Sequence, residues 1–442
     1  MMDKDTLKES LCKEIDRGRD QSIAIAETIL HNPELGFKEF ATAQLVSDHF
    51  KKLDIPHRTG LAITGVKGVI DTGRPGPTVA VMGELDSILL YEHPNANPET
   101  GAAHACGHNV QIAMMLAVAS AFKATNAASK LSGKIVFFAV PAEEYVEVEY
   151  RVNLARQGKL EFLAGKQELI RLGEFDDVDI TMLTHLTTRK EERRLSNLES
   201  SNGCVVKQVQ FIGKAAHAGG APHKGVNALN AAMVALSAIN AQRETFCDRD
   251  TVRVHPIITK GGDLVNVVPA DVRMETFVRA KTAAAIEDAD AKVNRALRAG
   301  AIAVGGKVKI KTLPGYMPLK ASKTLASIYK ENALALVGAE GYADVSHITG
   351  STDMGDISHI MPTIQPSAGG VIGTSHGADY QVVDMEEACI TPAKAMAMTV
   401  VDLLYDDAAQ AQRLLAADRP AFTKDEYLAY LRKYNSEILF EA

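Results

Sequence analysis

Short apolar runs that alternate with helical segments constrain the fold of this chain more than any other feature. Three of the runs have strand character and span residues 65–70, 78–82 and 134–140, the last with the sequence KIVFFAV. A long apolar helical stretch at 110–124 lies between the second and the third run. Wholly apolar strands separated by helices are typical of α/β proteins, so we predict a doubly wound, mostly parallel sheet.

The segment from 204 to 313 has a different rhythm, which predicts a separate domain. Its expected elements are a strand at 204–213, a helix at 227–243, strands at 252–258 and 271–279, a helix at 283–299 and a strand at 307–313. This βαββαβ order is that of the ferredoxin-like motif. A chain of 442 residues is also too long for one ordinary core. We therefore expect one domain formed by 1–202 and 314–442, with a second domain, 203–313, inserted into it.

Other helices are expected at 5–31, 40–53, 322–336 and 391–405, and a charged, helical insertion at 149–175. The last of these should lie near the functional site.

The composition excludes several classes of protein. Hydrophobic residues make up 46% of the chain and charged residues 23%, which is typical of a globular protein. The formal net charge of −7 gives no general attraction to nucleic acid or anionic lipid. A charged amino terminus and the lack of a long uncharged apolar stretch predict a cytoplasmic protein without a signal peptide or membrane span. The five cysteines are scattered and form no CxxC pair, which argues against a disulfide framework and a structural zinc knuckle.

Polar residues follow the apolar strands at once, in the place where open α/β sheets bind ligands. The sequence GELD follows the strand at 78–82, HACGHN opens the apolar helix, and PAEE ends the strand at 134–140. The candidate ligands and acid–base groups at these positions and later in the chain are Asp86, Cys106, His108, Glu143, Glu144, His185 and His376. Thiolate, imidazole and carboxylate are the ligands of zinc and similar divalent metals. Together these positions predict a metal site.

Each position also has an interpretation without a metal. The histidines of 104–109 could cap the helix while Cys106 packs in the core. Glu143 and Glu144 could form a solvated turn, although two carboxylates after an apolar strand are costly to bury unpaired. His185 alone would more often be a hydrogen-bonded histidine near the core. The metal site is favoured because several strand ends of one chain carry ligand-type side chains.

With these motifs the chain resembles the M20 metallopeptidases, and within them the amidohydrolase branch. The matching motifs in chain order are HNPELGFKE at 31–39, GELD at 83–86, HACGHN at 104–109, PAEE at 141–144, HAG at 217–219 with Pro222 and NAL at 227–229, NVVP at 266–269, and His376. Within that branch it resembles aminobenzoyl-glutamate hydrolases, N-acyl amino acid hydrolases and 5-nitroanthranilate aminohydrolase, and its motifs are closer to the subgroup with hydrolases of aminobenzoyl-glutamate and of dipeptides. The resemblance implies a binuclear-metal hydrolase whose βαββαβ segment is a lid domain.

The resemblance also implies a role for each residue of the predicted metal site. One ion would be held by Cys106, His108 and His185, and the other by Cys106, Glu144 and His376. Cys106 would thus bridge the ions, a role that other branches give to an aspartate, and Asp86 would orient His108. Glu143 would be the general base acting on a metal-bound hydroxide or water. Zinc or manganese is favoured, with cobalt or nickel as alternatives and with one or two ions per subunit.

Three residues of the lid segment would bind substrate. His217 would stabilise the oxyanion, reaching in from the partner subunit of a homodimer or higher homo-oligomer formed through the lid. Asn266 and Arg279 would hold a substrate carboxylate, Arg279 through a bidentate pair. An ordinary surface cation is an equal alternative interpretation of Arg279.

The chain departs from the branch pattern at several places. Asn109 stands where aspartate is usual, and Glu84 stands where the strand-end signature has an aspartate. The charged insertion lengthens the interval between Glu144 and His185, and together with Tyr145 it would reshape the pocket. Substrate therefore cannot be inherited from the resemblance.

The leading hypothesis is hydrolysis of the amide of an N-acyl or N-aroyl amino acid, or of a dipeptide. An alternative with the same metal site is hydrolytic deamination of a substituted aminobenzoate such as 5-nitroanthranilate. A non-catalytic binding homologue would be expected to lack a ligand or the base, yet every position is filled. A cysteine hydrolase using Cys106 and a histidine is a further alternative, which metal removal would distinguish.

Overall fold

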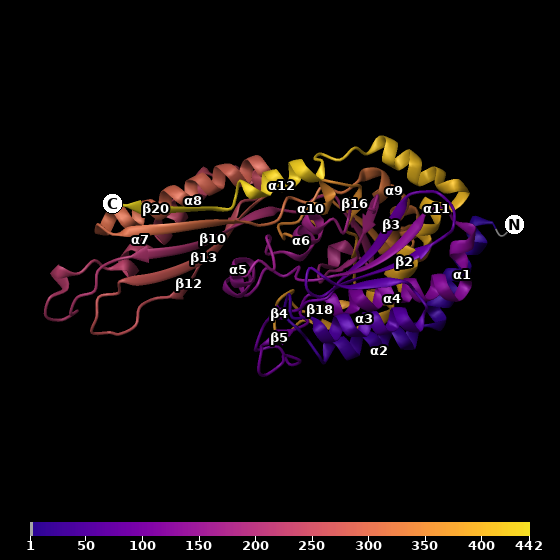
Figure 1. Ribbon diagram of the computed structural model, residues 1–442, viewed down its shortest axis with the longest axis horizontal. Coiled ribbons are helices and arrows are strands. Elements are labelled where there is room, and N and C mark those ends of the chain that lie inside the picture. The colour runs from indigo at the N-terminus through magenta and orange to yellow at the C-terminus, as the bar shows by residue number, and fades with distance from the viewer. Residues whose placement is uncertain (1–2) are drawn as a thin grey trace. The chain divides into compact units, whose positions relative to one another are not determined.

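The computed structural model describes residues 3–442 as two compact units (Figure 1). The first comprises the described residues up to 199 together with 320–347 and 356–424. The second comprises 200–319, 348–355 and 425–442, so it is assembled from three stretches of sequence.

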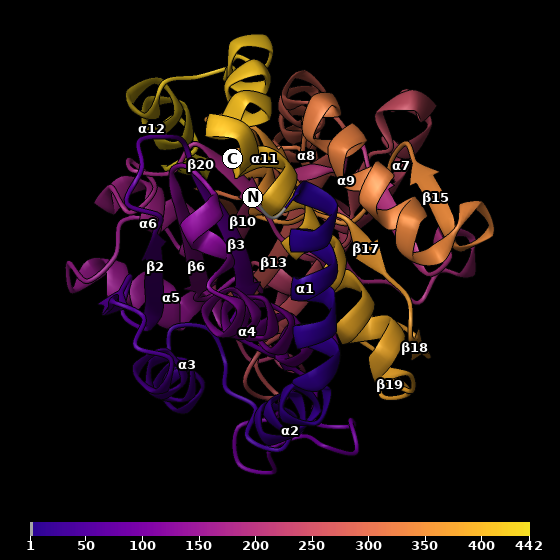
Figure 2. The ribbon, with the colours of Figure 1, turned by 90° about the vertical axis from the view of Figure 1, so that its right-hand side faces the viewer.

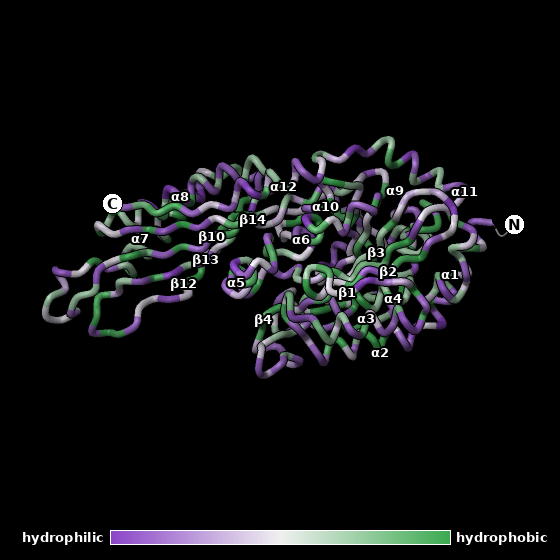
Figure 3. The backbone as a smooth tube through the Cα atoms, viewed as in Figure 1, coloured by the Kyte–Doolittle hydropathy of each residue, from purple (hydrophilic) through white to green (hydrophobic). Residues whose placement is uncertain are grey.

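The first unit is built on a six-stranded sheet in the order β1-β2-β6-β3-β7-β16. The strands are β1 (His57–Leu61), β2 (Gly65–Asp71), β3 (Thr78–Glu84), β6 (Lys134–Val140), β7 (Ile180–Met182) and β16 (Thr363–Ile364). The last four in the spatial order are parallel to one another, and β1 and β2 add antiparallel pairs at one edge. β3 is buried along its whole length and is mostly apolar (Figure 3), as expected for a central parallel strand. The predicted α/β class with a mostly parallel sheet is confirmed.

Helices pack on this sheet around α4 (His108–Thr125), which contacts β3 and β6. α1 (Lys4–Arg17), α2 (Arg19–Leu30) and α11 (Thr391–Ala417) pack against α4 (Figure 2), and α3 (Phe40–Lys52) packs against β2. α9 (Lys323–Val337) packs against α11. Because α4 is surrounded by other elements, its sequence is apolar on almost every side rather than along one stripe.

A smaller sheet and two short helices complete the elements of the first unit that concern the site. The sheet order is β15-β9-β17-β8, with β15 (Tyr342–Val345), β9 (Leu195–Leu198), β17 (Ser367–Ala368) and β8 (His185–Leu186). α5 (Val148–Arg156) and α6 (Gly165–Leu172) occupy the predicted charged insertion between β6 and β7.

Of two predicted helices, the one at 5–31 differs from the structure and the one at 391–405 agrees with it. The single helix predicted over 5–31 is wrong, because Gly18, with φ −81° and ψ 4°, leaves the helical conformation and separates α1 from α2. The helix predicted to end at 405 does end there, because residues 405–408 within α11 leave the helical conformation. The helical stretch Glu386–Ala417 is long and apolar enough to cross a membrane. However, 89% of its most apolar part is buried inside the fold, as is typical of a core helix.

The second unit follows the predicted βαββαβ order, except that two short strands, both paired with β13, stand in place of the single strand predicted at 252–258. Its elements are β10 (Gly203–Ile212), α7 (Ala228–Ala241), β11 (Arg253–Val254), β12 (Ile257–Lys260), β13 (Asp271–Ala280), α8 (Ala283–Val304) and β14 (Lys307–Pro314). The sheet is antiparallel, in the order β11-β13-β10-β14-β20 with β12 also paired to β13, and α7 and α8 pack on it and on each other. Alternate residues of β13 are buried, which is typical of a sheet covered on one face.

The last strand of this sheet comes from the carboxyl-terminal end. After α12 (Lys424–Arg432), β20 (Ser436–Glu441) pairs antiparallel with β14 along six residues. The expected division places all of 314–442 in the other domain, so residues 314–319, 348–355 and 425–442 differ from it. A single short run of residues does not reveal which distant edge it will pair with.

Candidate metal centre

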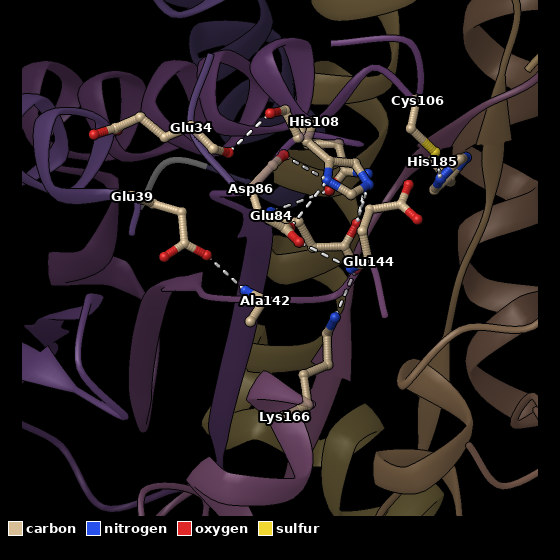
Figure 4. A network of polar contacts seen from close by, with 12 residues as sticks. Glu34, Glu39, Glu84, Asp86, Cys106, His108, Ala142, Glu144, Lys166 and His185 are labelled. Carbon is tan, nitrogen blue, oxygen red and sulfur yellow. Dashed lines mark hydrogen bonds and ion pairs between the residues drawn. The ribbon is translucent and has the colours of Figure 1, made fainter. Parts of the chain in front are cut away.

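The ends of β3 and β6 and the start of α4 bring the candidate residues of the first unit together (Figure 4). Glu84 ends β3, Asp86 follows it, and Glu143 and Glu144 follow β6. Gly107 separates Cys106 from α4 and has a φ of 86°, a left-handed conformation that glycine adopts without strain. A Cβ at this position would also lie 2.7 Å from the Tyr380 hydroxyl oxygen. This turn lets Cys106 and the first residue of α4, His108, face one site.

Two sets of three ligand-type side chains share Cys106. The first is Cys106, His108 and His185, and the second is Cys106, Glu144 and His376. In each set the ligand atoms lie within 4.8 Å of one another. Two atoms bound to one zinc ion at about 2.0–2.3 Å can be at most about 4.6 Å apart, so these spacings are close to what an ion requires. A donor set of one sulfur, three imidazoles and one carboxylate fits divalent transition metals.

His108 is held from both sides by carboxylate groups. Its Nδ1 lies 2.9 Å from the backbone oxygen of Asp86 and 3.3 Å from Asp86 Oδ1. Its Nε2 lies 3.0 Å from Glu84 Oε2. Asp86 Oδ2 also accepts a hydrogen bond from the amide of Glu144 at 2.8 Å. Asp86 therefore contacts one candidate ligand through its side chain and fixes the backbone of another, as a residue that supports metal ligands should.

His185 lies beside Cys106 despite the long interval that the insertion creates. Its Nε2 is 3.4 Å from Cys106 Sγ, and its Nδ1 is 2.7 Å from the carbonyl oxygen of Leu186. A proton on Nδ1 would be bound by that carbonyl, which leaves Nε2 as the nitrogen that faces the site.

His376 reaches the site from a late loop between β18 (Val371–Ile372) and β19 (Gln381–Val382). Its backbone is left-handed, with a φ of 63°, and its amide donates to the carbonyl of Ala105 at 2.9 Å. The imidazole Nε2 lies 3.1 Å from Glu144 Oε1, and 52% of the side chain is exposed, whereas Cys106, His108 and Glu144 are buried and His185 is half-buried. The second set is therefore the side of the centre that opens to solvent.

The charges of the cluster are strongly interdependent. Burial and the Glu144 carboxylate would raise the pKa of the Cys106 thiol, but His185 and His108 outweigh them and lower it to about 6. The Glu144 carboxylate raises the pKa of His376, and in spite of burial His376 holds the pKa of Glu144 well below its usual value. The buried thiolate is thus available near neutral pH, and the imidazolium charges are the ones that a bound cation would replace.

Glu143 belongs to a third set, with Glu84 and His108, whose ligand-type atoms also lie within 4.8 Å of one another. Glu143 is buried, with 7% of its surface exposed. It follows Ala142, a non-glycine residue with a φ of 52°. The turn after β6 therefore holds Glu143 beside the Cys106 sets while Glu144 enters one of them.

Three buried charged residues around this cluster were not predicted as site residues. Glu39 accepts a hydrogen bond from the Ala142 amide at 2.8 Å, Lys166 donates to Glu84 at 2.6 Å, and Arg151 donates to the carbonyl of Glu144. Burial opposes ionisation of Glu84, but the Lys166, His108 and His185 charges overcome it and lower its pKa. For Arg151 and Lys166 the sequence signal was the charged insertion, whose pattern does not distinguish a buried cation from an exposed one; Glu39 ends the motif at 31–39.

The residues predicted to bind substrate lie in the second unit. His217 and Asn266 are exposed on neighbouring segments, where the amide of Ala218 donates to the carbonyl of Asn266 at 2.8 Å. His217 Nδ1 accepts from the amides of Gly219 and Gly220 at 3.2 and 2.9 Å. Arg279 lies on β13 with its guanidinium carbon 5.1 Å from the ring centre of Phe277.

Comparison with known proteins identifies relatives that cover most of the chain. Residues 201–304 match the peptidase dimerisation domain of the M20 family. The Xaa-Arg dipeptidase of Mus musculus is 28% identical over 419 residues, which covers 91% of this chain and 90% of the relative. IAA-amino acid hydrolase ILR1-like 4 of Arabidopsis thaliana is 24% identical over 357 residues, 78% of this chain and 76% of the relative.

Solved structures share the fold. A putative aminohydrolase from methicillin-resistant Staphylococcus aureus superposes with a TM-score of 0.71 and 20% identity, covering 89% of this chain and 99% of its own. A dinuclear metal binding peptidase of the M20 family from Bacillus subtilis has a TM-score of 0.64 and 20% identity, covering 88% and 99%. The resemblance seen in the sequence motifs is thereby confirmed: the chain is similar to M20 peptidases and amidohydrolases, and its residues 201–304 match their dimerisation domain.

Proposed function

We propose that the protein is a metal-dependent hydrolase that cleaves the amide C–N bond of a small, carboxylate-bearing molecule, either an N-acyl or N-aroyl amino acid or a dipeptide. Its homologues are named dipeptidase, IAA-amino acid hydrolase and carboxypeptidase, which are all hydrolases of C–N bonds. The observation that carries the proposal is the pair of ligand sets that share Cys106 next to the buried Glu143.

The two sets would hold one divalent ion each, with Cys106 common to both. When bound, such ions lower the pKa of water and polarise the carbonyl group that is attacked. The mixed donor set suits zinc or manganese, and cobalt or nickel as alternatives.

Glu143 would accept a proton from the attacking water at a carboxylate oxygen and deliver it to the departing nitrogen. Its burial restricts access of bulk water to that carboxylate. Asp86 would keep His108 in the orientation and tautomer that the site needs, through the contacts at Nδ1.

The second unit would supply the groups that bind substrate. In neutral His217, Nδ1 accepts two backbone N–H groups, so the proton resides on Nε2, which is then a donor suited to an oxyanion. Asn266 and Arg279 would bind the substrate carboxylate.

A homodimer formed through this unit would bring His217 to the site of the partner. The dimerisation-domain match supports this arrangement, as do the exposed apolar side chains of Met233 on α7 and Ile257 on the sheet-edge strand β12.

The test is a substrate panel assayed with protein loaded in turn with Mn²⁺, Zn²⁺, Co²⁺ or Ni²⁺. The panel contains Xaa-Arg dipeptides, other dipeptides, IAA-amino acid conjugates, aminobenzoyl-glutamate and substituted aminobenzoates, and both released amine and released ammonia are followed. Amine release that stops on metal removal and returns on reloading supports the proposal. Ammonia release confined to an aminobenzoate would replace amide cleavage by deamination, and turnover that survives complete metal removal would refute the metal-dependent mechanism.

A further inference from the structure

The 148–172 segment, which contains α5 and α6, buries two cations beside the carboxylates of the candidate metal centre. Arg151 and Lys166 are both fully buried, whereas Arg156 and Lys159 of the same segment are exposed. A buried cation is costly unless its hydrogen-bonding and charge partners are in place. The partners of these two residues therefore show what the segment is built around.

The hydrogen-bond partners of Arg151 are three backbone carbonyls, two of which flank Glu143. The guanidinium donates to the carbonyl of Glu144 and to that of Leu163 at 2.7 Å, and its Nη1 lies 3.4 Å from the carbonyl oxygen of Ala142. The planar fork of arginine can hold several carbonyls at once, which an ammonium cannot do in the same geometry.

The turn that Arg151 holds is conformationally demanding. Ala142 has a left-handed φ of 52°, which an alanine adopts only when its surroundings enforce it. Its amide is fixed by the Glu39 carboxylate at 2.8 Å. Gly36 packs so closely that a Cβ there would overlap the Arg151 guanidinium. The positions of Glu143 and Glu144 therefore depend on groups outside the turn itself.

Lys166 contacts Glu84, which links the segment to His108 (Figure 4). Lys166 Nζ lies 2.6 Å from Glu84 Oε1, and Glu84 Oε2 lies 3.0 Å from His108 Nε2. Gln111 donates to Glu84 Oε2 at 2.9 Å and accepts from its amide at 3.1 Å. Because Asp86 contacts Nδ1, Nε2 is the nitrogen of His108 that is left to face the site, and Lys166 holds the Glu84 carboxylate in one orientation beside it.

We propose that the 148–172 segment is a positioning element of the metal centre, in which Arg151 fixes the turn that carries Glu143 and Glu144, and Lys166 fixes Glu84 against His108. Arg151 and Lys166 are positioning residues, since each acts through another group. The inference rests on the proposed function only in taking the Cys106 sets as a metal site. If the segment positions the ligands, metal affinity, and not only turnover, depends on residues outside the ligand sets.

The first experiment measures Co²⁺ binding to the full chain, by competition with a chelator and by the visible spectrum of the Co²⁺-loaded protein. The variants are Arg151→Lys, which keeps the charge, and Lys166→Met. Supporting groups around metal ligands typically contribute 10- to 100-fold in affinity, so a weakening of about 10- to 100-fold and a shifted Co²⁺ spectrum are expected. The matched controls Arg156→Met and Lys159→Met alter exposed cations of the same segment and should bind as the unchanged protein does. Affinity and spectrum at the level of these controls in both test variants would overturn the proposal.

The second experiment is a double-mutant cycle with Glu84→Gln. If Lys166 acts through Glu84, Lys166→Met should change Co²⁺ affinity little once Glu84 is already glutamine. Lys166→Met alone leaves the buried Glu84 carboxylate without its cation, which could unfold the protein. The double variant removes both charges of the pair, so its Co²⁺ affinity can be measured even in that case. A full additional loss in the double variant would refute the assigned coupling. Both experiments need no substrate, so a protein with these shifts and no turnover on the panel would refute the function while leaving the positioning intact.

Discussion

The thiol of Cys106 should ionise near pH 6 in the metal-free protein, three pH units below its ordinary value of 9.0. Burial and Glu144 act against this, and His185 and His108 supply the charge that reverses their effect. Three units correspond to about 4 kcal/mol in favour of the thiolate. At pH 7 about 90% of the thiol would be ionised, compared with about 1% for a thiol of ordinary pKa. A thiolate ready at neutral pH is what a bridging sulfur ligand requires.

The assay is a pH titration of the ultraviolet thiolate absorbance after metal removal, with the titration of Cys106→Ser subtracted. Burial raises the pKa of Cys12 to about 11 and that of Cys389 to about 12, so neither contributes near neutrality. Replacing His185 by glutamine should move the midpoint of Cys106 upward, because it removes a positive charge next to the sulfur. A midpoint near 9 in the unchanged protein, or one that does not respond to the His185 change, would refute this account of the site.

Three further predictions concern the ligands, the base and stability. Cys106→Ala should reduce the affinity for both ions, whereas His185→Ala should reduce the affinity for only one of them. Metal content is measured by elemental analysis and affinity by titration, and an equal loss of metal from both variants would contradict the prediction. Glu143→Gln should retain the metal content of the unchanged protein and lose several orders of magnitude in kcat, so near-normal turnover would exclude it as the base. Burial, with a smaller effect of Lys52, lowers the pKa of His49 to about 4. Because the unfolded chain protonates this histidine near pH 6.5 and the folded chain near pH 4, stability should fall by about 3 kcal/mol as pH drops between these values. In His49→Gln the urea-unfolding free energy should vary less over that range, and an unchanged pH dependence would count against the assignment.

The elements predicted best are those whose own sequence determines them. β6 has the predicted bounds 134–140 because a run of apolar and β-branched residues between polar ones leaves little choice of structure. The βαββαβ order followed from similar local patterns. The break at Gly18 was missed because one glycine within a continuous apolar pattern is often tolerated in a helix.

The candidate ligands could be predicted from position, because chemistry-bearing side chains follow buried strands and meet at one edge of the sheet. Arg151 and Lys166 could not, since their partners are backbone carbonyls and a carboxylate that only the folded chain brings near. His217, Asn266 and Arg279 stay predictions as substrate-binding residues, because their roles depend on a bound substrate and a partner subunit.

The pairing of β20 with β14 has a consequence during translation. The chain completes β14 long before it completes the strand that covers its edge. About 120 residues separate the two, so at 5–20 residues per second that edge stays open on the ribosome for roughly 6 to 24 seconds. An open strand edge is a template for pairing with other chains. Nascent chains on neighbouring ribosomes would therefore be most prone to misassembly in this interval, and slowing synthesis after residue 314 would lengthen it.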